Sequence, residues 1–202
     1  MQRLDQQIRF VAEVGKLKGI VRQTVLAGDG LNRHENSAEH SWHLAMMVLV
    51  LGEHAPAGTD LARVTAMVLI HDLVEIDAGD LFLYADAAAQ AQQDAAERAA
   101  ADRIFAILPG EQADELRKLW DEFNARQTPD AKFARAIDRL QPMFENLTAG
   151  GGTWQRHGIT ADQVLAMVAL IEDGSPQLGD VGRDLVNRAV AAGLLLPAPS
   201  AT

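Results

Sequence analysis

Leu69-Ile-His71-Asp72-Leu-Val-Glu75-Ile-Asp-Ala-Gly-Asp80 closes an apolar run that begins at Leu61 and has the length of a buried helix. Two charge-capable side chains, His71 and Asp72, therefore stand at the end of a helix that the core should bury. Burial of such groups is costly unless a partner compensates them. Glu75 follows His71 by four residues and Asp72 by three, so on a helix all three share one face. The stretch predicts a helical fold with one site that these three residues serve.

Two further ligand-type residues lie in other stretches of helical periodicity. His40 follows Asn36 and Glu39, which form a loose capping box and predict a helix start. Asp138 lies among core-type residues in a stretch that begins at Thr128-Pro129, a cap followed by proline. A buried aspartate needs a positive partner, which a metal ion would supply. The candidate ligands are therefore His40, His71, Asp72 and Asp138.

Taken singly, each of these residues has a purely structural interpretation. Either histidine could be a hydrogen-bonded core residue, and Asp138 could pair with Arg135 or Arg139. Glu39 and Glu75 would be ordinary acids on helix surfaces. The choice depends on the sequence around them.

The sequence around the candidate ligands resembles one family. Asn36-Ser-Ala-Glu-His40-Ser-Trp, the His71-Asp72 stretch and Ala136-Ile-Asp138-Arg-Leu together resemble the HD-domain metal-dependent phosphohydrolases. The resemblance is strongest to the small single-domain group of bacterial 5′-deoxynucleotidases and their eukaryotic HD-domain relatives, and runs from about Leu17 to about Leu147. It implies an enzyme that hydrolyses (deoxy)nucleoside 5′-monophosphates to nucleoside and phosphate. The alternatives are a phosphatase for another small phosphorylated metabolite and a catalytically silent nucleotide- or metal-binding module.

The rest of the chain agrees with an all-α fold of this type. Hydrophobic residues make up 48% of the 202 residues, enough for a sizeable core in one domain. They recur at helical spacing along almost the whole chain, and sustained alternation is absent. We therefore expect a single-domain HD-type helical bundle of about eight helices over residues 1–202. Its motif-bearing core spans about 17–147, and C-terminal helices at 160–195 pack on that core.

The types of ligand limit the choice of metal. Two imidazoles and two carboxylates suit Mn²⁺, Co²⁺, Ni²⁺, Fe²⁺ or Zn²⁺ better than Mg²⁺. Binuclear members of the superfamily that this chain resembles carry additional histidines between the His-Asp pair and the last aspartate. No histidine lies between Asp72 and Asp138. We expect one divalent transition metal ion.

The resemblance also implies roles for side chains around the metal. Glu75 is placed to orient or deprotonate a water molecule, and Asp80 to assist the leaving 5′-oxygen. Arg22, helped by Lys18, would hold the substrate phosphate, because relatives place an arginine in the same Leu-Lys-x-x-x-Arg context. Glu122 matches an acid of the relatives and is a further candidate behind the site.

Gln23 marks a departure from the bacterial enzymes. Those relatives follow the phosphate-binding arginine with a tryptophan that crowds the 2′ position of the sugar. A slimmer residue that donates and accepts hydrogen bonds predicts weak discrimination between deoxyribose and ribose.

Composition excludes several classes of partner and site. The net charge of −10 argues against a nucleic-acid polymer, because binding a polyanion requires many Lys and Arg residues. The absence of cysteine excludes disulfides and thiolate ligands. The N-terminus lacks a signal-peptide pattern and no apolar run has the length of a membrane span, so we expect a cytoplasmic protein.

A symmetric homodimer is the expected assembly. The terminal run from Ala189 to Leu196 is apolar, and relatives in the group that this chain resembles are usually dimers. His43, three residues after His40, is expected to pack rather than to bind metal.

Overall fold

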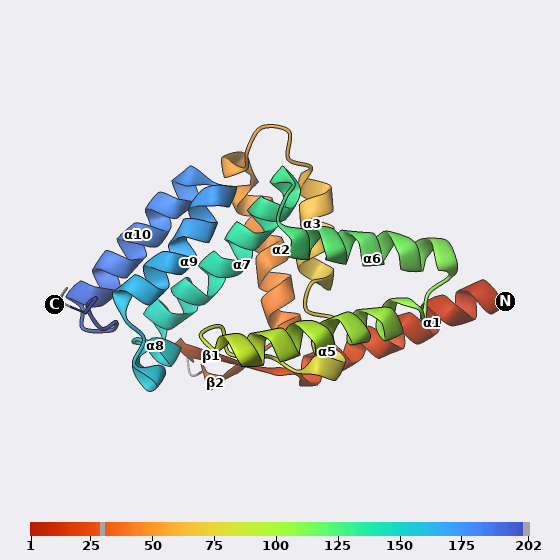
Figure 1. The fold of residues 1–202 in the computed structure, drawn as a ribbon, viewed down its shortest axis with the longest axis horizontal. Helices are drawn as coiled ribbons and strands as arrows, with labels where there is room; N and C mark the ends of the chain where they lie inside the picture. The colour runs from red at the N-terminus through yellow and green to blue at the C-terminus, as the bar shows by residue number, and fades with distance from the viewer. Residues whose placement is uncertain (29–30, 200–202) are drawn as a thin grey trace.

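A computed structural model describes residues 1–28 and 31–199 of the chain. The described part contains ten α-helices, two 3₁₀ helices and one β-hairpin (Figure 1). The α-helices are α1 (Gln2–Val14), α2 (Ser37–Leu51), α3 (Leu61–Ile70), α4 (Glu75–Ala78), α5 (Ala87–Phe105), α6 (Gly110–Ala125), α7 (Pro129–Thr148), α8 (Gly152–His157), α9 (Ala161–Gly174) and α10 (Pro176–Ala191). The 3₁₀ helices are η1 (Gly15–Gly19) and η2 (Gly52–His54), and the hairpin consists of β1 (Val21–Gly28) and β2 (Leu31–Asn36).

The all-α prediction is confirmed for the body of the molecule. Eight of the described helices have ten residues or more, and the short helices α4 and α8 add to them. A helix of four to six residues has too little periodicity to be recognised in a sequence. The predicted start signals are also present, because the side chains of Asn36 and Thr128 accept hydrogen bonds from the backbone N–H groups of Glu39 and Ala131.

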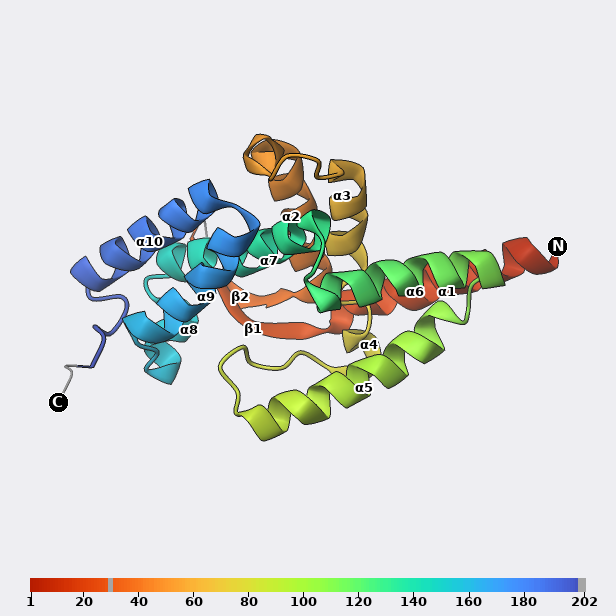
Figure 2. The same cartoon turned by 45° about the horizontal axis from the view of Figure 1, so that its top comes forward.

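The hairpin departs from the sequence prediction. Its strands are antiparallel, with Val25 opposite His34 and Val21 opposite Asn36, and the register shifts between these two pairs. Such an irregularity breaks the alternation of side chains by which a strand is recognised in a sequence. The hairpin matters for the site because β1 carries Arg22 and contacts α7 (Figure 2).

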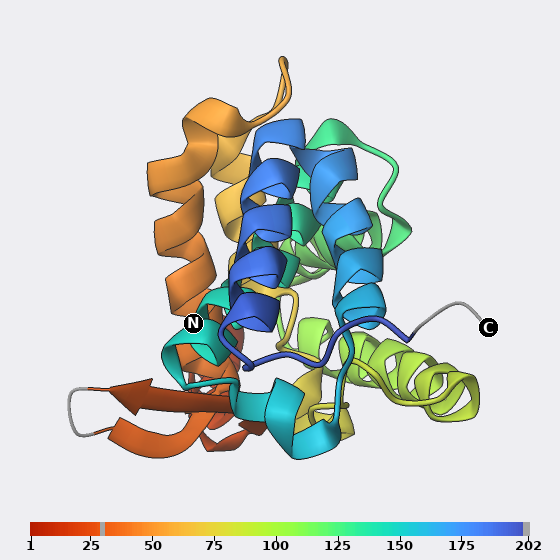
Figure 3. The same ribbon diagram turned by 90° about the vertical axis from the view of Figure 1, so that its left-hand side faces the viewer.

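Helix α7 is the centre of the bundle. It packs against α9 and α10 on one side and against α2, α3 and α6 on the other (Figure 1). Figure 3 shows α9 and α10 side by side, with α8 and the hairpin at their lower end in this view. Ala134, Ile137 and Leu140 of α7 are fully buried. Polar residues on the inward faces of α7 therefore need partners inside the molecule.

The largest group of exposed apolar side chains lies on α1 and α2, not on the Ala189–Leu196 run that the sequence prediction named. Within the Ala189–Leu196 run, Ala189 is 0% and Leu195 3% exposed, whereas Leu196 is 51% exposed, so the run is buried only in part. Large exposed apolar side chains instead gather on α1 and α2, and they are Leu4, Ile8, Val11, Trp42, Met46, Leu49 and Val50. Within residues 1–28 and 31–199, no helix combines the length and apolar content that a membrane span needs.

Candidate active site

Three helices bring the four predicted ligand residues together. His40 lies in the first turns of α2, and Asp138 lies in the middle of α7. His71 caps the end of α3, and Asp72 follows it in the turn that leads to α4. All four are buried, so the pair of charge-capable residues that closes the apolar run does lie in the interior.

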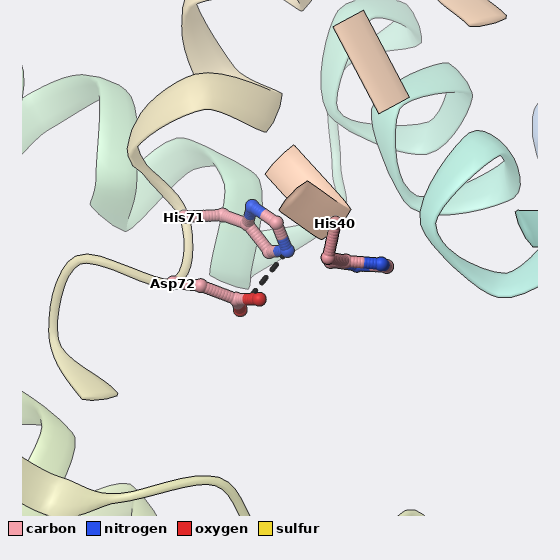
Figure 4. Close-up of side chains that lie close together, drawn as sticks. All are labelled: His40, His71 and Asp72. Carbon is pink, nitrogen blue, oxygen red and sulfur yellow. Dashed lines mark ion pairs between the residues drawn. The ribbon is translucent and has the colours of Figure 1, made fainter. Parts of the chain in front are cut away.

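The donor atoms of these side chains face one another. The Nε2 atoms of His40 and His71 lie 3.2 Å and 3.6 Å from the same oxygen, Asp138 Oδ1. Asp72 Oδ1 lies 3.0 Å from His71 Nε2, and Figure 4 shows that ring and that carboxylate turned toward each other beside His40. One donor atom from each of His40, His71 and Asp72 lies within 4.8 Å of the other two. A single ion can be shared by donors at this spacing.

Hydrogen bonds behind the rings determine which nitrogen faces the site. His71 Nδ1 lies 2.9 Å from the carbonyl oxygen of Val68, to which it donates, so Nε2 is left as an acceptor. His40 Nδ1 lies 3.1 Å from Gln141 Oε1, with the same consequence. His71 Nε2 is buried and has no hydrogen-bond partner among the described residues. A buried imidazole nitrogen with an unused lone pair fits a metal ligand.

The charges around His71 favour a positive occupant. Burial opposes charge on this ring, but Asp72 and Asp138 raise the pKa of His71 to about 10. Burial would raise the pKa of Asp138, but Arg139 and the two histidines hold that pKa well below its ordinary value. A divalent ion that replaces the proton on His71 would meet the same two carboxylates.

Glu75 begins α4 and lies against the same group of residues. It is 6% exposed, and Ser37 Oγ donates a hydrogen bond of 2.5 Å to its Oε2. Burial and the neighbouring Asp72 carboxylate raise the pKa of Glu75 well above its ordinary value. A carboxyl group whose pKa is displaced toward neutrality can exchange a proton with a reacting group.

Asp80 reaches the site because the chain turns sharply after α4. Gly79 has φ 75°, a backbone conformation that glycine adopts without steric cost. Asp80 Oδ2 accepts a hydrogen bond of 3.2 Å from the backbone N–H of Gln23. Burial raises the pKa of Asp80 although Arg22 opposes this shift.

Arg22, on β1, meets four carboxylates. Its Nη1 atom lies 2.7 Å from Asp72 Oδ2, 3.7 Å from Asp80 Oδ1 and 3.8 Å from Glu75 Oε1. Its Nε atom lies 3.4 Å from Glu35 Oε2. Burial would lower the pKa of Arg22, but these carboxylates raise it above the ordinary value. Arg22 therefore holds together the acids on one side of the site.

Two other arginines meet the second oxygen of Asp138. Asp138 Oδ2 lies 3.1 Å from Arg135 Nη1 and 3.7 Å from Arg139 Nη1. The ion pair that a structural interpretation of Asp138 predicts is therefore present. It coexists with the contacts that Oδ1 makes to the histidines, so one carboxylate serves both purposes.

A cavity of about 410 Å³ adjoins these residues. Its polar lining includes Arg22, Gln23, His71, Asp72, Glu75, Asp80, Arg126, Arg135, Asp138 and Arg139. Its apolar lining includes Phe82, Tyr84, Trp154, Val164, Met167 and Leu170. A cavity of this size and mixed character suits a small ligand with an anionic end and an apolar end.

The remaining predicted residues lie in different places. Gln23 lines the cavity, and its side chain is exposed. Lys18 is exposed on η1, and Glu122 on α6 accepts a hydrogen bond of 2.6 Å from Thr128 Oγ1; neither lines the cavity. The structure does not bring Lys18 and Glu122 to the site. His43 is half-buried and lies outside the group of His40, His71 and Asp72; its donor atom instead lies near carboxylate oxygens of Glu35 and Glu145.

Glu35 and Gln141 are site residues that sequence reasoning missed. Gln141 Oε1 accepts from His40, and its Nε2 donates to Glu35 Oε1 at 2.8 Å. Gln141 follows Asp138 by three residues on α7, so its helical face was a usable signal. Glu35 offered no such signal, because its contact depends on how the hairpin is placed against α7.

Known proteins support the motif assignment at the level of family. A family model described as an HD domain matches residues 14–178. The 5′-deoxynucleotidase HDDC2 of Danio rerio is 26% identical over 142 residues, which cover 70% of this chain and 68% of that protein. The protein of the same name from Homo sapiens is 26% identical over 138 residues, which cover 68% of this chain and 65% of that protein. The matched region thus spans about two thirds of these relatives.

Solved structures show the same architecture. A predicted metal-dependent phosphohydrolase from Magnetospirillum magnetotacticum MS-1 is 48% identical, with a TM-score of 0.92 over 97% of each chain. The PH0347 protein of Pyrococcus horikoshii OT3, at 20% identity and a TM-score of 0.61, shares the fold over 89% of this chain. With the HD-domain match over most of its length, this chain belongs to the HD domain family.

Proposed function

We propose that this protein is a metal-dependent phosphomonoesterase that hydrolyses (deoxy)nucleoside 5′-monophosphates to nucleoside and phosphate. The observation that carries the proposal is the unpartnered Nε2 of His71, which faces two carboxylates and a second imidazole beside a cavity. Membership of the HD domain family and relatives named 5′-deoxynucleotidase support the same reaction.

In this proposal His40, His71, Asp72 and Asp138 hold one divalent transition metal ion, which is Mn²⁺, Co²⁺, Ni²⁺, Fe²⁺ or Zn²⁺. When bound, such an ion supplies a Lewis acid that lowers the pKa of water and polarises a phosphoryl group. Val68 and Gln141 fix the two rings with Nε2 inward, which prepares both histidines for this task.

Glu75 and Asp80 supply the proton transfers. Glu75 accepts the proton of the attacking water, and the hydroxyl of Ser37 orients its carboxyl group. Asp80, whose pKa burial raises, gives a proton to the leaving 5′-oxygen. Both acids lie beside Arg22, so one guanidinium positions both groups.

Arg22 contacts the substrate phosphate on the Asp72 side of the ligand group, the role that the resemblance assigns to it. Gln23 adjoins it at the edge of the cavity and lies toward the sugar. The apolar lining that includes Phe82, Tyr84 and Trp154 receives the base. A nucleotide thereby has its phosphate at the polar end of the cavity and its base at the apolar end.

The decisive experiment crosses metals with substrates. Purified protein is loaded in turn with each of the five ions and with Mg²⁺, and phosphate release is measured from deoxynucleoside and nucleoside monophosphates and from sugar phosphates. We expect release from the nucleotides with at least one transition metal and little with Mg²⁺. Release from sugar phosphates alone would support a phosphatase for another metabolite. No release from any substrate would point to a silent binding module.

We also infer a homodimer and a cytoplasmic location. The dimer is supported by the exposed apolar side chains of α1 and α2, such as Ile8, Val11 and Leu49, rather than by the C-terminal run. Light scattering at micromolar concentration should give the mass of two chains, and a monomer would contradict the dimer.

A further inference from the structure

Three arginines line the Asp138 side of the cavity. Arg135 and Arg139 follow one another by four residues on α7, so their side chains share a helix face. Arg126 follows the end of α6 and lines the same cavity. We refer to Arg126, Arg135 and Arg139 as the arginine cluster.

Among the described residues, Asp138 is the one acid at ion-pair distance from Arg135 and Arg139, although Asp94 and Glu97 also line the cavity. Arg135 and Arg139 share a single carboxylate oxygen, Asp138 Oδ2, whereas Arg22 meets four carboxylates. The Nε atoms of Arg135, Arg139 and Arg22 are all buried without a hydrogen-bond partner among the described residues, but Arg22 Nε has Glu35 Oε2 at 3.4 Å. Two buried guanidinium groups that share one carboxylate oxygen repel each other, and an anion bound beside them would reduce this repulsion.

The backbone at Arg126 supports the same conclusion. Arg126 has φ 56° and ψ 36°, and among residues 1–28 and 31–199 it is the one non-glycine residue with positive φ. It occupies the position after a helix where glycine is the usual residue, because a side chain there is strained. Strained backbone conformations occur most often at functional sites. Here the strained residue contributes a third guanidinium group to the lining of the cavity.

Placement within the cavity indicates what the anion is. Asp138 joins the cluster to the histidines, since its Oδ1 lies near both Nε2 atoms and its Oδ2 lies near Arg135 and Arg139. Tyr84 and other aromatic side chains line the same cavity, so the cluster and the aromatic lining face a common space. A phosphomonoester bound at the histidines would therefore lie close to these guanidinium groups.

We propose that the arginine cluster is a phosphate-binding subsite that contributes most of the affinity for the substrate's phosphoryl group. The subsite deepens the phosphomonoesterase function proposed above and rests on it. Guanidinium groups suit this task because they donate several hydrogen bonds in one plane to phosphate oxygens. Arg22, already surrounded by carboxylates, then contacts the phosphate as a smaller contributor and also holds Asp72 and Glu75 in place.

The test titrates inorganic phosphate into the manganese-loaded protein by calorimetry. Arg135→Met and Arg139→Met keep the apolar stem of the side chain but remove the charge. Each should weaken phosphate binding by about ten- to hundredfold, the loss expected for a hydrogen bond to a charged group. The matched control is Arg188→Met on α10, where an arginine with 63% exposure pairs with an acid four residues away. The control should bind phosphate like the unmodified protein.

Arg126→Gly separates binding from folding. Glycine relieves the strained backbone, so the melting temperature should rise by about 2 to 4 °C. Phosphate affinity should nevertheless fall by about three- to tenfold, because one cation is lost from the mouth of the cavity. If Arg126 had a purely structural role, its replacement by glycine would not both raise the melting temperature and weaken phosphate binding.

Phosphate release from dAMP and metal content are measured on the same samples. If the unmodified protein releases phosphate and the three cluster variants bind phosphate as tightly as it does, the subsite is overturned while the phosphomonoesterase stands. If no nucleotide is hydrolysed but phosphate binding still requires the cluster, the subsite stands and the enzymatic proposal fails. If a cluster variant loses its metal or its fold, the result for Arg126→Gly decides.

Discussion

The two aspartates of the ligand group are built alike, but the arginines behind them are not. Asp72 turns Oδ1 toward His71 and Oδ2 toward Arg22, while Asp138 turns Oδ1 toward the histidines and Oδ2 toward Arg135. Behind Asp72, one guanidinium is surrounded by acids. Behind Asp138, two guanidinium groups share one carboxylate oxygen.

This difference changes what each arginine can do. The carboxylates around Arg22 raise its pKa, and Asp72 accepts a hydrogen bond from it, so Arg22 stabilises the protein's own acids. Arg135 and Arg139 share one oxygen of Asp138, so an added anion is favoured beside them. We therefore distinguish an Arg22 side, which positions acids, from an Arg135 side, which binds the substrate's charge.

Removing either aspartate tests the feature that the two sides share. Because each aspartate directs one oxygen at the histidines, Asp72→Ala and Asp138→Ala should both lose bound metal and reduce phosphate release to background. His43→Ala, outside the ligand group, should keep its metal. Elemental analysis of the purified variants measures this. If either aspartate variant keeps its full metal content, that aspartate is not a ligand and the two aspartates do not have the same role.

Glu75→Gln tests whether the acids beside Arg22 perform proton transfer. Glutamine can still accept the hydrogen bond of Ser37 but cannot take a proton from water. We expect unchanged metal content and phosphate affinity, with kcat lowered by roughly 10²- to 10⁴-fold. Glu39→Gln, an acid paired with Arg33 at the surface, is the control and should keep its activity. Loss of metal from Glu75→Gln would instead make Glu75 a ligand.

The stability of the metal-free protein should separate the two sides most directly. Arg22→Met leaves several buried carboxylates without their cation, so we expect the free energy of unfolding to fall by roughly 3 kcal/mol. Arg139→Met removes one of two like-charged neighbours, so the change should stay within about 1 kcal/mol. Urea denaturation with a chelator present measures both. Equal losses would show that the two sides are electrostatically equivalent.

Local signals explain why much of the fold was accessible from the sequence. Helical periodicity predicted the long helices, and the capping residues Asn36 and Thr128 marked two starts correctly. The His71-Asp72 pair stood out because it closes an apolar run, and the structure places His40 and Asp138 beside it.

The remaining features depend on contacts between distant segments. Gln141 meets Glu35 across 106 positions of sequence, through a hairpin whose shifted register hides its alternation. Arg135 was recognised as a partner of Asp138, but its excess of positive charge emerges only when Arg126 is brought to it from the end of α6. The net charge of the chain is −10, so composition gives no sign of this local group of positive charges.

Gln23 offers the mildest test, because it lies beside Arg22 on the side that we expect to contribute less to substrate binding. Its side chain is exposed at the cavity, and its backbone N–H donates a hydrogen bond to Asp80. A free amide at the sugar should accept deoxyribose and ribose with similar ease, so we expect kcat/KM for dAMP to exceed that for AMP by less than about tenfold. Gln23→Trp should enlarge this preference by crowding the 2′-hydroxyl, without changing metal content or phosphate affinity. Kinetics of the two nucleotides with both proteins measure the effect.

Two outcomes would contradict this prediction. A strong deoxy preference in the unmodified protein would show that another residue excludes the 2′-hydroxyl. A loss of phosphate affinity in Gln23→Trp would place the phosphate closer to Arg22 than to the arginine cluster.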